Sequence, residues 1–406
     1  MKFNNLLLII NVLVTYLFVA NNIIIDAVPL ILRDASNATD ANDGKWEFVG
    51  KTGVSAMHMT LIRPTKVLII DKAGINPEAL IANGNLHTNT FCSAGAYLAN
   101  GTMVETGGAE DTAGEKNGFQ SVRLIDGCDD GNCDWLEFPY ELDSARWYNT
   151  MASLPDGRRI LSHLNLYPTV IVLPGPKGQT WLFLAANKKA QIWDYTSKEI
   201  VKHLPDIPGG PRTYPLTGTG ALIPLSYRNN YQAEIIVINL ADKNPQWDED
   251  EFGPNMETGR LMPDVIHLPD GKLLYVNGAG TGMAGWDKKA TNKTPRLHTA
   301  DPIVRVYHSS ATLVPDGTVF VAGSNPNRYY CGMDQCEHPT EHRAEKFYPP
   351  YLLNGVSRPT ITKVAGHTKL NDADAIPVKY GQTISVEVEV DSPTPQFTSS
   401  LSHMVS

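Results

Sequence analysis

The chain has 406 residues, of which 42% are hydrophobic and 19% are charged, and its formal net charge is -9. This length and composition suffice to bury a large core and predict one large domain with a small one beside it. Because no basic tail or patch offsets the negative charge, we exclude nucleic acid and anionic membrane surfaces as partners, whereas small neutral or cationic partners fit the charge.

The first 27 residues have the pattern of a secretory signal peptide. Lys2 supplies the positive charge at the start, and an apolar run extends from Leu6 to Ala20. Ala20 and Ala27 are the two candidate cleavage positions. A membrane anchor is the weaker alternative, because polar residues from Asn21 onward follow too soon for a full span. No later segment is long and apolar enough to cross a bilayer, so we expect a secreted, extracellular protein that is free of the membrane after signal cleavage.

Sites for N-linked glycans fit an exported glycoprotein. The acceptor pattern Asn-x-Ser/Thr marks an exposed loop in a secreted chain. Such triplets also arise by chance, so they support secretion without proving it. The acceptors are Asn37, Asn100 and Asn292.

The five cysteines make an odd count for an oxidising compartment. Cys128 lies five positions before Cys133, and Cys331 lies five positions before Cys336. Each pair is spaced to close a small disulfide loop, although spacing alone does not fix the connectivity. Cys92 is left over, and a lone cysteine in a secreted chain is either a buried small hydrophobe or a reactive group. The alternative for the second pair is a zinc site with the ligands Cys331, Cys336, His338 and His342.

After the leader, one hairpin pattern recurs: an apolar strand, a turn built on glycine, and a second apolar strand. Turn glycines Gly101 and Gly157 are 56 positions apart, and Gly271 and Gly317 are 46 apart. A period near fifty with short strands predicts an all-β, kelch-type β-propeller, with six to seven blades over residues 28–357. The hairpins are Ala96–Gly108, Thr150–Leu161, Asp264–Gly278 and Ser310–Gly323.

Two segments depart from this period. Gly157 and Gly178 are only 21 positions apart, so one blade is expected to have lost strands. Near the end, a Pro349-Pro350 pair and an alternating strand from Gln382 to Val390 indicate a second domain. Residues 358–406 are therefore expected to form an incomplete immunoglobulin-like β-sandwich, since the complete fold takes about 100 residues.

Several chemically distinctive residues lie just before these hairpins. Cys92 and Tyr148 each precede one, and Tyr307 and His308 precede another side by side. His403 follows the last expected strand. Each residue alone is more often a packing residue than a ligand, but the inner strands of propeller blades converge on the axis. Residues at their starts can then meet although they are far apart in sequence.

Longer motifs in a fixed order between Trp46 and Ser406 resemble one family, the copper radical oxidases. That family comprises galactose oxidase and glyoxal oxidase, and the resemblance is closest to glyoxal oxidase-like proteins. The motifs are "NTFCSAGAYL", "ARWYNTMASLPDG", "NLYPTVIVLP", "GGPRTYPLTGTGALIPL", "MPDVIHLPDG", "NGAGTGMAGW", "VRVYHSSATLVPDGTVFVAGSNPN" and "EKFYPPYL".

The resemblance implies a role for each candidate site residue. Cys92 matches the cysteine that forms a thioether with a tyrosine ring, and Tyr148 matches that tyrosine, a copper ligand that holds the radical. Tyr307 matches the axial tyrosine ligand and general base, and His308 matches an equatorial histidine. His403 resembles the second histidine. Two imidazoles and two phenols form a hard N/O set that suits Cu(II) better than zinc or iron.

The implied function is that of a secreted copper radical oxidase, monomeric, with a copper ion and a self-derived Tyr148–Cys92 thioether cofactor. It would oxidise small aldehydes such as glyoxal or methylglyoxal to carboxylic acids and reduce dioxygen to hydrogen peroxide. One alternative is a galactose oxidase-like oxidase of primary alcohols. The other is a catalytically inactive secreted kelch propeller that acts as a binding module.

Two features differ from the family pattern. A segment is missing near Ser162 to Asn165, which implies less shielding around Tyr148. The chain also ends three residues after His403, where the family continues with several more strands. We therefore expect His403 to lack support, and the 406-residue chain to bind copper weakly and to be poorly active.

Overall fold

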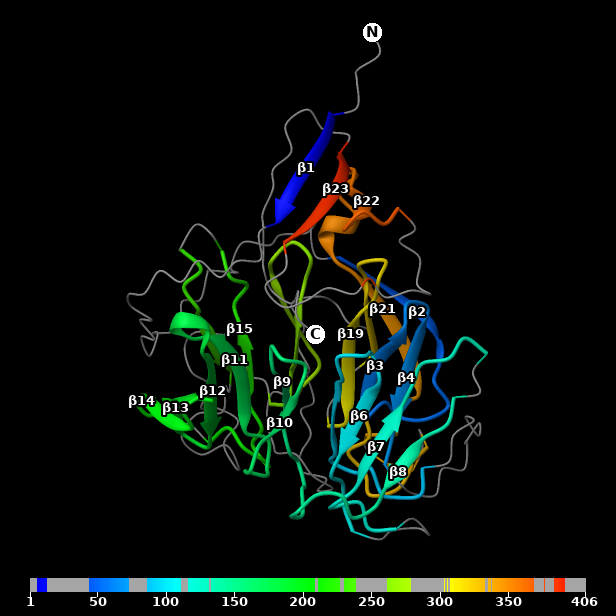
Figure 1. The fold of residues 1–406 in the computed structure, drawn as a ribbon. Coiled ribbons are helices and arrows are strands. Elements are labelled where there is room, and N and C mark those ends of the chain that lie inside the picture. The colour runs from blue at the N-terminus through cyan, green and yellow to red at the C-terminus, as the bar shows by residue number, and fades with distance from the viewer. Residues whose placement is uncertain are drawn as a thin grey trace.

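A computed structural model describes residues 6–12, 44–72, 86–110, 116–130, 133–208, 211–226, 230–238, 261–278, 303, 305, 307–332, 335–336, 338–368, 376 and 383–390. These residues form an all-β structure of small antiparallel sheets, as the sequence predicted (Figure 1). No helix within these ranges has the length and apolarity that a bilayer span needs. The two short 3-10 helices described are η1 (Pro176–Gly178) and η3 (Pro350–Leu352).

Three sheets have four strands each. In each of them, strands that follow one another in sequence pair as antiparallel neighbours, and the third sheet also takes up a strand from the N-terminal side. Their strands, in hydrogen-bonded order, are β5 (Ala94–Tyr97), β6 (Met103–Thr106), β7 (Val122–Ile125) and β8 (Leu136–Phe138); β11 (Thr169–Pro174), β12 (Thr180–Ala186), β13 (Lys189–Asp194) and β14 (Glu199–His203); and β19 (Ser309–Leu313), β20 (Val319–Gly323), β21 (Arg343–Tyr348) and β2 (Lys45–Lys51).

Four further sheets have two described strands each. The β9–β10 sheet is the shortened unit that the sequence predicted, because the whole stretch from β8 to β11 is described and contains only these two strands. All four predicted hairpins are confirmed, as β5–β6, β9–β10, β17–β18 and β19–β20. The two-stranded pairs are β3 (His58–Arg63) with β4 (Lys66–Ile70), β9 (Met151–Ser153) with β10 (Arg159–Leu161), β15 (Thr219–Leu222) with β16 (Ile235–Ile238), and β17 (Asp264–His267) with β18 (Leu273–Val276).

The first strands of these seven sheets are neighbours in space. Each strand contacts the next one in the order β5, β9, β11, β15, β17, β19 and β3. The Tyr97 hydroxyl in β5 joins the two ends of the series, because it lies 2.8 Å from Thr60 Oγ1 and donates to the Leu61 carbonyl of β3 at 2.7 Å. The starts of distant hairpins are therefore brought close together.

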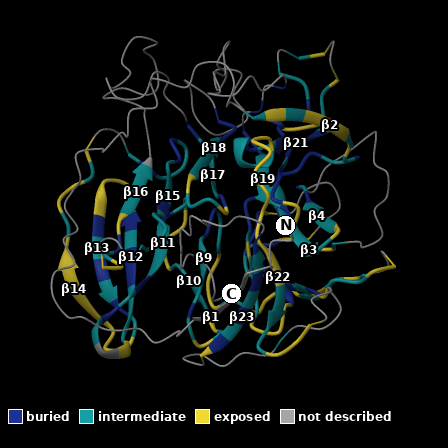
Figure 2. Cartoon of the chain, turned by 90° about the horizontal axis from the view of Figure 1, so that it is seen from above, coloured by how far each residue is buried: buried dark blue, intermediate teal, exposed yellow. Residues whose placement is uncertain are grey.

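Burial increases from the outer strands toward the inner ones. In the β11–β14 sheet, every residue of the outer strand β14 is exposed, whereas Leu182 and Phe183 of β12 are buried (Figure 2). In the β19–β20–β21–β2 sheet, Val319 and Val321 of β20 are fully buried and pack with Phe347 of β21. The core thus lies between sheets, on strands that have neighbours on both faces.

A last sheet lies beyond these seven, at the top of Figure 1, and has the order β1–β23–β22. Strand β23 alternates as its sequence predicted, with four apolar side chains buried along one face. Strand β1 belongs to the expected signal peptide and pairs with β23. The signal peptide and the proposed domain limits at 27 and 357 stay predictions. The strands are β1 (Leu6–Val12), β23 (Ile384–Val390) and β22 (Thr360–Val364).

The cysteines are distributed as their spacing predicted. Cys128 is bonded to Cys133 and Cys331 to Cys336, while Cys92 is free and buried. The zinc alternative for Cys331, Cys336, His338 and His342 is wrong, because the two thiols it needs are joined to each other. Of the glycan acceptors, Asn100 lies exposed on the β5–β6 turn, whereas Asn37 and Asn292 lie outside the described residues.

Candidate metal centre

The candidate site is built at the starts of inner strands, where the backbone takes an uncommon conformation. Cys92, Tyr148 and His308 have φ of 63°, 50° and 59°, and Tyr167 and Met262 have 61° and 56°. Left-handed backbone is infrequent for residues other than glycine and costs on the order of 1 kcal/mol, so it persists only where the surroundings hold it. Each of these residues lies one to three positions before the first strand of a sheet.

Main-chain hydrogen bonds join these starts from one sheet to the next. The Tyr148 N–H donates to the Cys92 carbonyl at 2.8 Å, and the Tyr167 N–H donates to the Tyr148 carbonyl at 2.7 Å. The Tyr214 N–H in turn donates to the Leu166 carbonyl at 3.0 Å. The hydrogen bonds fix the relative positions of residues that precede four different sheets.

Three of the expected site residues meet in one buried cluster. Cys92, Tyr148 and Tyr307 pack together and have exposed fractions of 1%, 0% and 3%. The hydroxyl groups of Tyr148 and Tyr307 are hydrogen-bonded to each other, although the residues are 159 positions apart in sequence. The meeting of residues from separate hairpins, expected from the sequence, is therefore observed for these three.

His308 adjoins the same cluster. Its ring stacks on the ring of Tyr307 with centroids 3.6 Å apart, and the ring of Phe91 meets it edge-on at 5.2 Å. Burial lowers the pKa of His308 well below its usual value, and the charges of Lys72 and His58 lower it further. The imidazole is therefore neutral at pH 7, which is the form that binds a metal. His403 lies outside the described residues.

Burial also keeps the thiol and phenol protons in place. It raises the pKa of Cys92 well above its usual value, against the smaller effect of hydrogen bonds to Tyr307 and Trp147. It raises the pKa of Tyr307 in the same way, and the nearby Cys92 raises it further. Both groups are therefore neutral at pH 7 in the metal-free protein, so ionising them requires a new positive charge.

Aromatic side chains cover the ring of Tyr148 on several sides. Tyr214 stacks on it at 4.4 Å with 22° between the planes, Tyr167 lies at 4.5 Å, and Trp147 at 4.8 Å. Met262 also packs against the cluster. No role was predicted for these residues from the sequence. Tyr167 and Tyr214 each precede a proline, in "NLYP" and "RTYP", and this repeated Tyr-Pro pair was the available signal.

A buried polar group follows directly after Cys92. Ser93 Oγ donates to the carboxylate of Glu105 on β6, and His58 Nδ1 lies 3.1 Å from the same carboxylate. Burial alone would raise the pKa of Glu105, but His58, Arg123 and Ser93 together bring it below its usual value. The carboxylate is therefore charged and holds the main chain beside Cys92.

A buried lysine lies near the cluster. Lys72 is buried, and its ammonium group donates to the carbonyl of Asn327 at 2.6 Å and to that of Arg328 at 3.1 Å. Burial lowers the pKa of Lys72 to about 8, against the raising effect of Asp71 and Cys92. The ammonium group is thus mostly charged at pH 7 and joins the end of β4 to the loop after β20.

The donor atoms fit a copper ion better than the other common metals. Two phenol oxygens meet, and a neutral imidazole lies against one of them, which gives a hard N/O set suited to Cu(II). Within the described ranges, no cluster of three or more His, Cys, Asp or Glu side chains offers a competing site. Phenol oxygens are not among the usual donors of zinc or calcium sites, so this donor set differs from both.

Known proteins with similar sequences fall in one family. A family model described as the glyoxal oxidase N-terminus matches residues 76–162, 161–242 and 237–351. The protein named aldehyde oxidase GLOX1 from Arabidopsis thaliana is 31% identical over 79% of this chain and 60% of its own length. The protein named aldehyde oxidase GLOX from Vitis pseudoreticulata is 29% identical over 91% of this chain and 85% of its own length. This chain therefore spans less than two thirds of the first relative.

Among solved structures, one similar chain is a fungal alcohol oxidase of the AA5 family in complex with copper. It has 15% sequence identity and a TM-score of 0.45, and the match covers 86% of this chain and 93% of that one.

Proposed function

Because this chain belongs to the family described as the glyoxal oxidase N-terminus, we propose that it is a secreted copper radical oxidase that oxidises small aldehydes. The observation that carries the proposal is the buried meeting of Cys92, Tyr148 and Tyr307 with His308 stacked beside them. The products are a carboxylic acid and hydrogen peroxide, formed from an aldehyde hydrate and dioxygen. The names of the two plant relatives support an aldehyde as the substrate class.

We also propose that residues 28–357 form a seven-bladed propeller with the site on its axis. Seven small sheets whose first strands contact one another in series support this arrangement. Residues 358–406 then begin the second domain. The two disulfides support an oxidising, extracellular compartment. The proposal also includes a monomeric state and, because the formal net charge is -9, no nucleic acid or membrane partners.

In this proposal the copper ligands are Tyr148, Tyr307, His308 and His403. When bound, copper supplies a positive charge and a one-electron acceptor. Oxidation of an aldehyde hydrate removes two electrons. The ring of Tyr148 joined to Cys92 would accept the second in its radical form, and that form would be restored when dioxygen takes up two electrons and two protons to become hydrogen peroxide. The surrounding rings of Tyr214, Tyr167 and Trp147 exclude water from this ring, which substitutes for the shielding that the segment near residues 162–165 would supply.

Tyr307 is the proton acceptor. Its hydroxyl oxygen is buried and faces the oxygen of Tyr148, so a substrate oxygen near both can transfer its proton to the Tyr307 phenolate. The phenolate exists only when a cation offsets the burial that raises the pKa of Tyr307. Base strength and metal binding are thereby linked in one residue.

The thioether forms within the same cluster. The S–H bond of Cys92 and one ring C–H bond of Tyr148 are broken, a C–S bond is formed, and the two electrons and two protons reduce dioxygen to hydrogen peroxide. The main-chain hydrogen bond from the Tyr148 N–H to the Cys92 carbonyl supports this step, and so does the burial of both side chains in one cluster.

The test is copper loading of the purified chain followed by peroxide measurement in air. Glyoxal and methylglyoxal are compared with primary alcohols, including galactose. We expect peroxide from the aldehydes and none when dioxygen is removed. Peroxide from the alcohols alone would establish the alcohol oxidase alternative. If the chain produces no peroxide from any of these substrates, even at an excess of copper, the inactive binding module remains as the function.

A further inference from the structure

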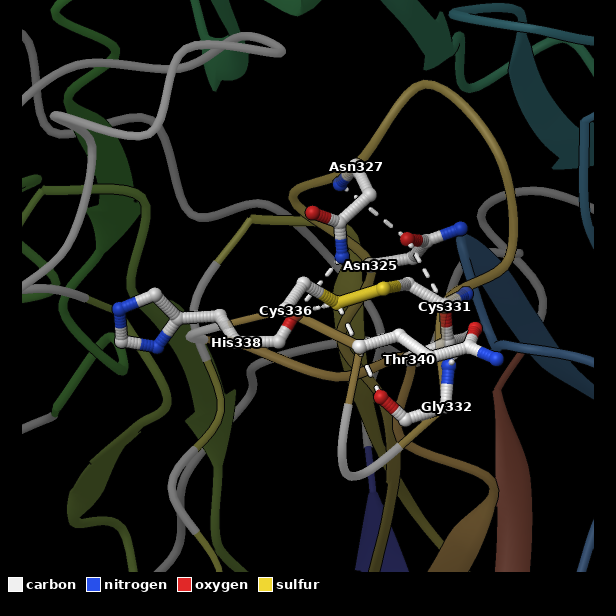
Figure 3. The surroundings of a disulfide bond; sticks show 8 residues. Asn325, Asn327, Cys331, Gly332, Cys336, His338 and Thr340 are labelled. Carbon is white, nitrogen blue, oxygen red and sulfur yellow. Dashed lines mark hydrogen bonds between the residues drawn. A yellow bond between two sulfur atoms is a disulfide. The ribbon is translucent and has the colours of Figure 1, made fainter.

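The loop closed by Cys331 and Cys336 is connected through hydrogen bonds to the tyrosine–histidine pair. It follows the β19–β20 hairpin, and the hairpin begins immediately after His308. Figure 3 shows the disulfide with Asn325, Asn327 and Thr340 gathered around it. The loop is therefore close enough to influence the site without supplying a ligand.

Thr340 is held by the cysteine end of this loop. The Thr340 N–H donates to the Cys331 carbonyl at 2.8 Å, and the Cys331 N–H donates to Thr340 Oγ1 at 2.9 Å. Thr340 is buried, so both bonds are shielded from water. The pair fixes the direction in which the Thr340 hydroxyl donates.

That hydroxyl donates to Asn325, and Asn325 holds Tyr307. Thr340 Oγ1 lies 3.1 Å from Asn325 Oδ1, and the Asn325 N–H donates to the Tyr307 carbonyl at 2.8 Å. Asn325 is fully buried, with an exposed fraction of 0%. The bond continues the pairing of Ser309 with Gly323 two residues beyond the strand ends, across the irregular backbone of His308 and Ser324.

We propose that Asn325 and Thr340 are positioning residues of the metal centre, and that the Cys331–Cys336 disulfide keeps them in register with Tyr307. This inference rests on the proposed function for its effect on copper. The chain of hydrogen bonds from Cys331 through Thr340 and Asn325 ends at the Tyr307 carbonyl, in the peptide bond between the two proposed ligands Tyr307 and His308. Supporting residues behind metal ligands commonly alter metal affinity by about 10–100-fold.

The experiment compares three changes with a matched control. Thr340→Val removes the hydroxyl and keeps the shape, Thr340→Ser restores the hydroxyl, and a double variant carries Cys331→Ser with Cys336→Ser. The control carries Cys128→Ser with Cys133→Ser, which opens a disulfide of the same sequence separation between β7 and β8. Equal loops constrain the unfolded chain equally, so a global effect of losing a disulfide is the same in both double variants.

The first readout is hydrogen exchange of the Asn325 amide in the copper-free protein. We expect exchange to become faster, on the order of tenfold, in Thr340→Val and in the Cys331/Cys336 variant. The Thr340→Ser variant and the Cys128/Cys133 control should exchange as the wild type does. Equal exchange in all five proteins would overturn the proposal, whatever the function of the chain is.

The second readout is Cu(II) affinity by chelator competition, together with the electron paramagnetic resonance spectrum. We expect a roughly tenfold or greater loss of affinity and an altered spectrum in the same two variants. Unchanged affinity with faster exchange would contradict the link to the metal centre. Absence of Cu(II) binding by the wild type would overturn the proposed function, and the exchange readout would still decide whether Asn325 is positioned by the loop.

Discussion

Tyr307 and His308 are neighbours in sequence, yet their side chains should contribute in different ways. Tyr307→Phe leaves three of the proposed ligands, so we expect most copper binding to remain while turnover falls by about 10²–10⁴-fold, since a general base is lost. His308→Ala should instead lose copper, because it removes a nitrogen ligand from a buried site. Copper content and peroxide production measured on both variants separate the two roles. Wild-type turnover by Tyr307→Phe would contradict the base role.

Cys92 is the residue whose chemistry depends most on its surroundings. It is free, buried and packed against Tyr148, so we expect it to form a thioether once copper and dioxygen are supplied. Intact-mass measurement after copper loading should show the loss of two hydrogen atoms, and the loss should survive reduction of the disulfides. Cys92→Ala is the control and should show no such loss. A Cys92 thiol that still reacts with an alkylating agent after this treatment would contradict the prediction.

Glu105 links pH to stability beside the site. Its pKa is lower in the folded chain than the usual 4.3 or so of an unfolded one, so the folded state binds fewer protons in that range. Its stabilisation is therefore present above that pH and lost as the pH falls through the folded pKa. We expect Glu105→Gln to lower the free energy of unfolding by about 1–3 kcal/mol at pH 7, and the difference from wild type to shrink toward pH 3.

Urea unfolding of both proteins from pH 3 to pH 7 measures this difference. Glu199→Gln, an exposed change on β14, is the control and should stay within about 0.5 kcal/mol at every pH. A difference for Glu105→Gln that is constant with pH would contradict the assigned ionisation.

The sequence predicted the cluster around Tyr148 because four chemically distinctive residues precede hairpins. It did not predict the covering rings of Tyr167 and Tyr214. Tyrosine before proline is common in loops, and only the main-chain bonds between sheet starts bring these two against Tyr148. The covering role depends on contacts between sheets, which no local pattern encodes.

The hairpins were predictable as elements because each carries its turn signal in the sequence. The Pro-Asp-Gly turns need a glycine with positive φ, and Gly157, Gly271 and Gly317 have φ between 80° and 86°. The outer strands of the sheets were harder to predict from the sequence. Strands such as β8, with three residues and an exposed-intermediate-exposed pattern, lack the length and apolarity that identify a strand in isolation.

A glycine at the end of a hairpin can also allow two segments to approach each other closely, as Gly108 does. Gly108 follows β6 with φ of 147°, and a Cβ there would overlap the carbonyl oxygen of Asn89. Gly101, at the turn of the same hairpin, has φ of 87° and open space around it. We expect Gly101→Ala to cost about 1 kcal/mol from backbone strain alone and Gly108→Ala to cost about 2–4 kcal/mol from strain and overlap together.

Chemical denaturation of the two alanine variants measures the comparison. Equal losses would mean that the segment holding Asn89 moves aside without cost, and that the close approach is not needed for stability. A larger loss for Gly108→Ala would also predict slower or weaker copper loading, because Asn89 lies three positions before Cys92.

On the scale of the whole molecule, one sheet joins strands that lie near opposite ends of the repeated hairpin region. Strand β2 pairs with β21 in the sheet that begins at the Tyr307-His308 hairpin, although about 300 positions separate them. The sequence predicted the all-β repeat architecture from its period, but it gave no sign of this pairing. Strand partners that are distant in sequence are chosen by the surfaces that the rest of the fold leaves available.

The stability of the whole molecule should therefore depend on residues near the start of the folded chain. Trp46 of β2 lies opposite Phe347 of β21, with ring centroids 5.0 Å apart, and Phe347 is buried in the core of that sheet. We expect Trp46→Ala to lower the free energy of unfolding by about 2–3 kcal/mol, since only part of the indole is buried. Phe48→Ala on the same strand is the control, because Phe48 is 59% exposed and should change stability by no more than about 0.5 kcal/mol.

Hydrogen exchange on the two variants shows whether β2 stabilises the whole molecule or only packs against the edge of its own sheet. If β2 holds the molecule together, Trp46→Ala should speed exchange along β21 and also in the distant hairpin β5–β6, because opening between sheets exposes every neighbour in the series. Faster exchange confined to β2 and β21 would mean that the sheets are held independently and that β2 only covers an edge. In that case the buried site would depend on its local bonds at Asn325 and Tyr148 rather than on joining of the two ends.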